Sequence, residues 1–104
     1  MTAAAITPSV VQKTYIPSTS KTGTPIRLVQ YYLKATKASQ NDWILLETAI
    51  GKTVNSIVGA HGIVIDSSSD MAQETLTYDD SEDKLVLAAA TVGTVHVFVI
   101  MSEA

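Results

Sequence analysis

The chain has 104 residues, which is enough for one domain, and carries a net charge of −3. Charged residues make up 16% of it, against about 25% in an average globular protein. The seven basic residues are scattered, and only one is arginine. Because a nucleic-acid backbone is bound by clustered cations, we expect no nucleic-acid partner. The absence of cysteine excludes disulfides and thiolate metal sites.

We expect no targeting signal in the N-terminal residues. Residues 1–8 lack the basic start and the long apolar stretch of a signal peptide. No stretch of the sequence approaches the roughly 18 consecutive apolar residues of a membrane-spanning helix, so we expect no membrane partner. The cytoplasm is the expected location by default.

The β-branched residues predict the fold class. The chain holds 11 Val, 9 Ile and 13 Thr, close to a third of its length. These side chains are stiff at χ1 and suit a pleated sheet better than a helix. An all-β domain is therefore expected.

The first predicted elements are an arm, a strand and a loop. Residues 1–8 are expected to form a flexible N-terminal arm. Residues 9–16 are apolar enough for a strand, which ends at Pro17. Residues 17–25 contain two prolines, a glycine and small polar side chains, and this composition predicts a loop.

The next run, residues 26–36, is apolar on both faces of the predicted strand. Tyr31 and Tyr32 are adjacent and must therefore point to opposite sides. Residues 43–49 predict another strand, although a short helix within residues 26–50 remains an alternative because several alanines and leucines allow it.

The second half of the chain gives the clearest pattern. Residues 53–66 predict one long strand, or two strands broken near Gly59 and Gly62. A polar loop over residues 66–70 follows. Residues 74–88 alternate on either side of a five-residue acidic turn, which is typical of a hairpin.

The last strand is predicted over residues 95–102, after a turn at residues 91–94. Six to seven strands with regular turn signals indicate an antiparallel β-sandwich or jelly roll. We expect a single domain over residues 9–104.

Motifs for catalysis or cofactor binding are weak. Gly51-Lys52-Thr53 resembles the end of a phosphate-binding loop, but Leu46 stands where that motif needs its first glycine. His61 and His96 would hold a metal only if they met in space beside a carboxylate, so core or interface positions are preferred. The acidic residues between 66 and 83 fit no calcium loop. We expect no catalytic residue, no cofactor, no metal site and no enzymatic activity.

Trp43 is the only tryptophan and is interpreted as a core anchor between the sheets. If its ring were exposed, it would suit a platform on which a sugar stacks. A ligand-binding β-module, such as a carbohydrate binder using Trp43, is therefore the alternative functional hypothesis.

The final strand is apolar on both faces, which requires a cover on both sides. One face is expected to be core, and the other needs a neighbouring subunit or a packed arm. Apolar character opposite the presumed core selects the candidate residues of an oligomer interface: His96, Phe98, Ile100, Tyr31 and Val11.

Four segments in the second half of the chain resemble those of a known class of proteins. Residues 57–65 (IVGAHGIVI), 74–78 (ETLTY), 84–87 (KLVL) and 91–100 (TVGTVHVFVI) resemble small β-rich structural proteins of tailed bacteriophages. These proteins decorate or cement the capsid or belong to the tail, and the resemblance covers about residues 43–102. It implies a homo-oligomer, with a trimer favoured, attachment to a larger viral protein lattice, and a place in the virion.

The sequence thus favours a non-enzymatic structural protein that acts by packing against copies of itself. Its partners would be itself and, on the phage resemblance, a viral lattice.

Overall fold

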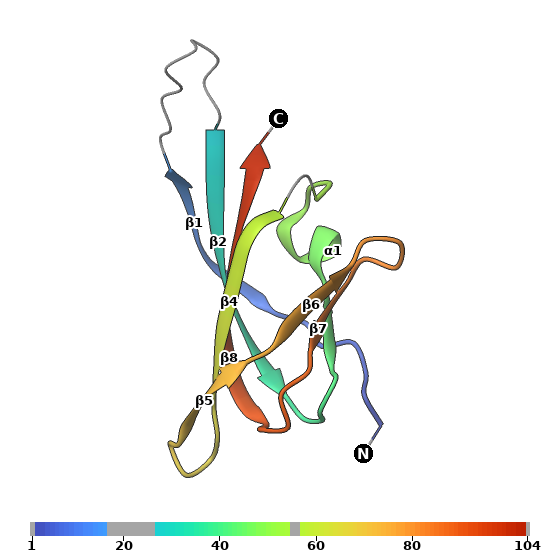
Figure 1. Cartoon of the computed structure of the whole chain (residues 1–104), viewed down its shortest axis with the longest axis vertical. Coiled ribbons are helices and arrows are strands. Elements are labelled where there is room, and N and C mark those ends of the chain that lie inside the picture. The colour runs from blue at the N-terminus through green and yellow to red at the C-terminus, as the bar shows by residue number, and fades with distance from the viewer. Residues whose placement is uncertain (1, 17–26, 55–56, 104) are drawn as a thin grey trace.

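The computed structural model describes residues 2–16, 27–54 and 57–103. These residues form eight strands and one short helix (Figure 1). The elements are β1 (Ser9–Ile16), β2 (Arg27–Lys37), β3 (Trp43–Leu45), α1 (Leu46–Ile50), β4 (Ile57–Ile65), β5 (Met71–Glu74), β6 (Leu76–Asp79), β7 (Lys84–Leu87) and β8 (Gly93–Glu103). The predicted all-β class is confirmed.

The strands form two antiparallel sheets that pack as a sandwich. The large sheet has the order β1-β2-β8-β4-β5, and the small sheet has the order β3-β7-β6. In Figure 1 the long strands of the large sheet run along the vertical axis, with the small sheet and α1 beside them. The hydrophobic core contains Val29, Tyr31, Leu33, Ala35, Ile44, Leu46, Val64, Leu85, Leu87, Val95, Val97, Val99 and Met101.

The centre of the large sheet is the pair β2–β8. The two strands are in register over their full length, from Arg27 opposite Glu103 to Lys37 opposite Gly93. Every second side chain of both strands enters the core. The side chains between them lie on the opposite face of the sheet. We call that opposite side of the large sheet the outer face.

The chain passes from one sheet to the other on both sides of the sandwich. On one side, Ala5 forms a parallel bridge with Trp43 before the chain enters β1. The Ile6 amide donates to the Trp43 carbonyl at 2.9 Å, and the Trp43 amide donates to the Ala4 carbonyl at 3.2 Å. The arm expected over residues 1–8 is thus hydrogen-bonded to the small sheet at residues 4–6.

On the other side, β5 belongs to the large sheet and β6 to the small one, with Thr75 between them. This division explains why the structure has eight strands where the sequence predicted six to seven. The hairpin predicted over residues 74–88 is present as β6 and β7, and the turn lies at residues 80–83.

Two predicted strands differ in extent. The strand expected over residues 43–49 ends at Leu45, and α1 follows, as the short-helix alternative allowed. The helix ends at Gly51, whose φ of 72° is left-handed. The long strand expected from residue 53 begins at Ile57 as β4, with an irregular register between Ile57 and Gly59. The loop predicted over residues 17–25 lies outside the described residues.

Within the described part of the chain, no helix has the length and apolar character needed to cross a membrane.

Candidate functional site

Three rings stand side by side on the outer face, one from each of three neighbouring strands. Tyr32 of β2 lies opposite Phe98 of β8, and Phe98 lies opposite His61 of β4. The Tyr32 and Phe98 centroids are 4.7 Å apart at an interplanar angle of 14°, and those of Phe98 and His61 are 4.8 Å apart at 15°. The spacing equals the distance of about 4.8 Å between strands, so the pleat itself produces the stack.

A hydrogen bond fixes one end of this ring stack. Tyr32 Oη and His96 Nδ1 are 2.6 Å apart, and the two rings are tilted by 36°. His96 lies on β8 two residues before Phe98, so it projects from the same face. The bond therefore holds the tyrosine ring upright against Phe98.

The outer face is more apolar than a solvated sheet face usually is. Tyr32, His96, Phe98 and Ile100 are half-buried, although only their neighbours on the same face shield them. The small sheet packs on the opposite side, against Val95, Val97 and Val99. Among the described residues, no second layer covers the ring stack.

Three of the five predicted interface residues, His96, Phe98 and Ile100, lie on this outer face. Tyr31 does not. It lies opposite Val99 in the register and is only 3% exposed, so its placement on a face away from the core was wrong. Its neighbour Tyr32 takes that position instead.

Val11, the fifth predicted residue, lies at the sheet edge, apart from the ring stack. It sits at a bulge of β1 between Val10 and Gln12 and is 51% exposed. Because β1 is the terminal strand of the large sheet, one of its edges has no neighbour in the sheet order.

Sequence reasoning missed His61 as a member of the ring stack. Its position opposite Phe98 depends on β4 lying next to β8 in the sheet. Strand order is not encoded in local spacing. His61 and His96 do lie on one face, yet the described residues contain no group of three or more His, Asp or Glu side chains able to hold a metal.

Trp43 is not the core anchor that was predicted. Ile44 points into the core and is fully buried, so Trp43 points to the other side of β3 and is half-buried. Lys84 Nζ lies 4.3 Å from the centroid of the indole ring, in cation–π geometry. Lys84 of the neighbouring strand β7 thus already contacts an indole face on which a sugar would stack.

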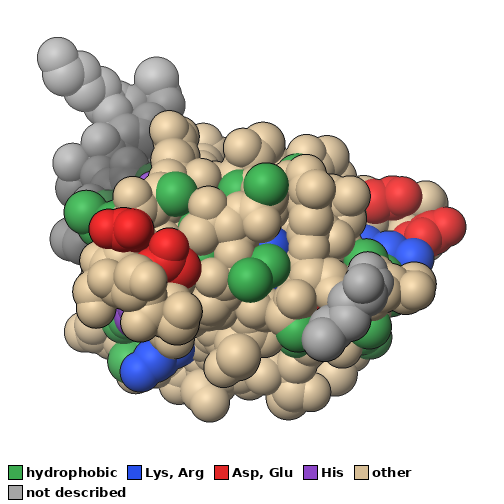
Figure 2. All heavy atoms as spheres, turned by 90° about the horizontal axis from the view of Figure 1, so that it is seen from below, with side chains coloured by type: hydrophobic (Ala, Val, Ile, Leu, Met, Phe, Trp, Pro, Cys, Tyr) green, Lys and Arg blue, Asp and Glu red, His purple; other side chains and the backbone are tan. Residues whose placement is uncertain are grey.

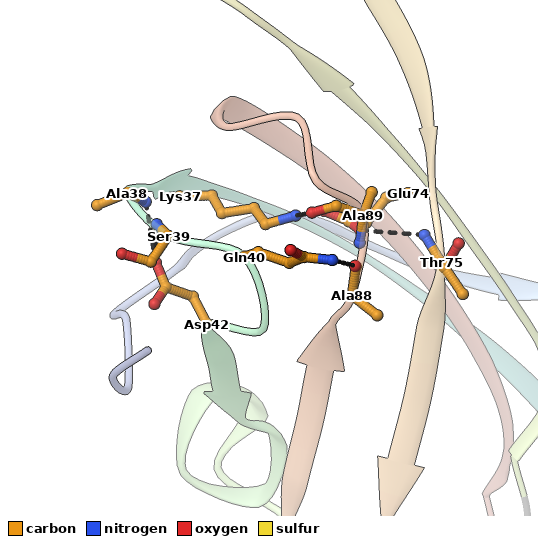
Figure 3. Close-up of polar contacts among 9 residues, drawn as sticks. All are labelled: Lys37, Ala38, Ser39, Gln40, Asp42, Glu74, Thr75, Ala88 and Ala89. Carbon is orange, nitrogen blue, oxygen red and sulfur yellow. Dashed lines mark hydrogen bonds and ion pairs between the residues drawn. The ribbon is translucent and has the colours of Figure 1, made fainter. Parts of the chain in front are cut away.

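The most deeply buried charges form an ion pair where the two sheets meet (Figure 3). Lys37 Nζ donates to Glu74 Oε1 and to the Ala89 carbonyl, both at 2.6 Å. The Glu74 Oε2 atom accepts the Thr75 and Ala89 amides at 3.0 and 2.8 Å. The ion pair therefore joins the end of β2, the corner between β5 and β6, and the loop before β8.

A second buried carboxylate, Asp42, closes the turn after β2. Its Oδ2 atom accepts the Ala38 and Ser39 amides, and its Oδ1 atom accepts the Ala4 amide, each at 2.9 Å. Burial opposes the charged form, but these three donors and nearby Lys37 outweigh it and lower the pKa of Asp42.

Asp83 plays the same part for α1. Both of its carboxylate oxygens accept the Glu47 amide, at 3.0 and 3.1 Å, and Oδ1 also accepts the Tyr78 hydroxyl at 2.9 Å. Burial and the neighbouring carboxylate raise the pKa of Tyr78. These carboxylates bind backbone amides and so hold the loops in place.

The remaining polar motifs also have structural partners. Gly51, from the segment that resembles a phosphate-binding loop, is the cap of α1 and donates its amide to the Glu47 carbonyl. In the acidic turns, Asp66 accepts the Ser68 and Asp70 amides, and Asp79 accepts the Ser81 amide.

No protein-family model matches the chain, and comparisons with curated proteins and with solved structures found no similar protein.

Proposed function

We propose that this protein is a non-enzymatic structural component that assembles with copies of itself through the outer face of its large sheet. The observation that carries the proposal is the ring stack of Tyr32, Phe98 and His61 on a face that no described residue covers. Aromatic side chains concentrate at the centres of protein interfaces because they bury large rigid surfaces.

The chemistry of the outer face suits burial against protein. Ile63, opposite His96, and Ile100, opposite Gly59, lie in the cross-strand rows on either side of the ring stack and add apolar area around the three rings. Removing apolar surface from water stabilises an assembly by about 25 cal/mol per Å². The Tyr32 hydroxyl already has His96 Nδ1 as a hydrogen-bond partner, so burying this hydroxyl would not leave it without a partner.

The low charge of the chain suits burial against protein, because buried charges without partners weaken an interface. Charged residues make up 16% of the sequence. Figure 2 shows one end of the molecule from below, where hydrophobic side chains lie at the surface between acidic side chains on two sides.

The buried carboxylates support a structural role over a catalytic one. The carboxylate oxygens of Glu74 and Asp42 accept hydrogen bonds from backbone amides, and Glu74 also accepts one from Lys37. A general acid or base needs a proton-transfer path to substrate, which such saturated carboxylates do not provide.

The finer part of the proposal is that the assembly is a trimer in a tailed-phage virion, where it decorates the capsid or belongs to the tail. It is supported by the resemblance of residues 43–102 to phage structural proteins. Neighbouring genes test it: capsid, portal or tail genes beside the coding sequence would support it, and an operon of metabolic genes would contradict it.

The self-assembly is tested with a pair of variants. Phe98→Gln removes the central ring of the stack, whereas Leu45→Gln changes an exposed leucine on the small sheet. Light scattering after size exclusion is expected to give a multiple of 11.1 kDa for the native protein and for Leu45→Gln, and a lower mass for Phe98→Gln. Circular dichroism checks that both variants fold. An equal oligomer mass for all three proteins would show that the ring stack is not the interface, and a mass of 11.1 kDa for all three would contradict self-assembly.

A further inference from the structure

A hollow of about 390 Å³ lies beside the ring stack, between β4 and the edge strand β5. It is lined by His61, Gly62, Ile63, Met71, Ala72 and Gln73. The volume is in the range of sites that bind small molecules. The lining contains no acidic, lysine or arginine side chain, and its polar side chains are the imidazole of His61 and the amide of Gln73. An uncharged ligand is therefore expected.

The hollow exists because the large sheet loses a strand beside His61. The pairs between β4 and β5 run from Ile65 opposite Met71 to Gly62 opposite Glu74 and stop there. The next residue, Thr75, leaves the sheet toward β6, and its carbonyl accepts the Ala88 amide instead. His61 thus has no cross-strand neighbour on β5.

The ring stack consequently ends on an open ring. Tyr32, Phe98 and His61 follow one another at 4.7 and 4.8 Å, nearly parallel. Phe98 covers one face of the imidazole, and among the described residues no ring continues the stack on the β5 side. His61 is exposed there. A fourth ring stacked on the open face of His61 would therefore lie over the hollow.

We infer that the hollow binds a small molecule carrying an uncharged planar aromatic ring, which stacks on His61 as the fourth ring of the series. Offset stacking on imidazole selects planarity. Met71, which is 69% exposed, is a flexible thioether at the rim and makes favourable contacts with aromatic edges. The amide of Gln73 offers a hydrogen bond to a polar substituent on the ring.

Indole and cyclohexanol are the probes, followed by two-dimensional NMR of the ¹⁵N-labelled protein. Indole is expected to shift the amides of Gly62, Ala72 and Gln73 saturably and to move the His61 ring protons upfield. Cyclohexanol, an uncharged cyclic molecule with no ring current or planar face, is expected to bind more weakly. Equal affinities for the two probes would overturn the inference.

Variants of His61 separate stacking from simple hydrophobic contact. His61→Phe keeps a ring and is expected to retain indole binding, whereas His61→Leu is expected to weaken it by about two- to tenfold, the worth of one aromatic stack. Trp43→Phe, on the small sheet, is the control and should leave the affinity unchanged. Indole binding that His61→Leu leaves intact would contradict the stacked position.

His61 belongs both to the proposed interface and to this hollow, so self-assembly and the planar ligand compete for its open face. The titrations are therefore run at a dilution at which light scattering gives the chain mass of 11.1 kDa. Absent shifts at His61 in that monomer mean a failed ring site, and a monomer at every concentration means failed assembly. Shifts confined to residues away from the hollow would likewise overturn the inference.

Discussion

Lys37 and Glu74 form an ion pair of 2.6 Å in which neither side chain is exposed to solvent. The pair joins β2 of the large sheet to the corner where β5 leaves that sheet for β6. Two charges buried this deeply are costly to desolvate, and the Ala89 and Thr75 backbone groups compensate by completing their hydrogen bonds. The corner that creates the hollow beside His61 is held by this pair.

Replacing one partner of the ion pair is expected to be severely destabilising. Lys37→Met leaves the Glu74 carboxylate buried without its cation, at a cost of about 3–5 kcal/mol in the free energy of unfolding. The double variant Lys37→Met/Glu74→Gln is expected to recover part of that loss, because no uncompensated charge remains. Urea unfolding measures both. As a control, Glu82→Gln breaks the exposed pair with Lys84 and should cost less than about 1 kcal/mol. Similar costs for the buried and the exposed pair would contradict this role.

Gly93 at the start of β8 is expected to tolerate no side chain. Its φ is 142°, and an added Cβ would meet the Ile65 carbonyl oxygen and lie 2.9 Å from the Asp66 Cα. Both neighbours are backbone, so Gly93→Ala should lower the free energy of unfolding by several kcal/mol, on the order of 3 or more. Gly59→Ala is the matched control, because an added Cβ there meets nothing within 4 Å. Thermal unfolding compares the two, and a Gly93→Ala variant as stable as Gly59→Ala would refute the close approach.

Asp42 is expected to contribute to acid sensitivity. Its pKa in the folded chain is lower than the 3.8 of an unperturbed aspartate: burial raises it, and the amides of Ala4, Ser39 and Ala38 more than offset that effect. A depressed folded pKa stabilises the protein above the unfolded value, and this stability is lost as the pH falls through the folded value. Asp42→Asn should therefore be less stable than the native protein at pH 7, and the difference should shrink below about pH 3.8. Urea unfolding at several pH values measures the difference, and a pH-independent gap would argue against the charge.

The hydrogen bond between Tyr32 and His96 is expected to stabilise the outer face. Tyr32→Phe keeps the ring against Phe98 and removes only the hydroxyl, so a loss of about 0.5–1.5 kcal/mol is expected. In a His96→Phe background the same change should cost much less, because the partner is already gone. A double-mutant cycle by urea unfolding measures this coupling. Additive costs would show that the 2.6 Å contact contributes nothing.

Elements with strong local patterns were predicted well from the sequence. The first strand has the predicted bounds, Ser9–Ile16, and the hairpin of β6 and β7 lies where the alternation and the acidic turn placed it. Local signals were sufficient in these cases: the apolar residues before Pro17 predicted the first strand, and the alternation around the acidic turn predicted the hairpin.

Elements that depend on distant partners were not predictable in this way. The sequence of β5, Met-Ala-Gln-Glu, has no β-branched residue, and the strand exists because β4 pairs with it. The start of α1 is held by Asp83, 36 residues further along the chain. The ring stack likewise needs β2, β8 and β4 to be neighbours, and the register of β2 decides that Tyr32 rather than Tyr31 joins it.

We propose that the outer face of the large sheet brings copies of this chain together. Sedimentation equilibrium of the native protein over a wide concentration range tests it most directly. The expected result is a mass that rises with concentration toward three times the chain mass of 11.1 kDa. A mass of 11.1 kDa at every concentration, up to the highest that stays in solution, would contradict the claim.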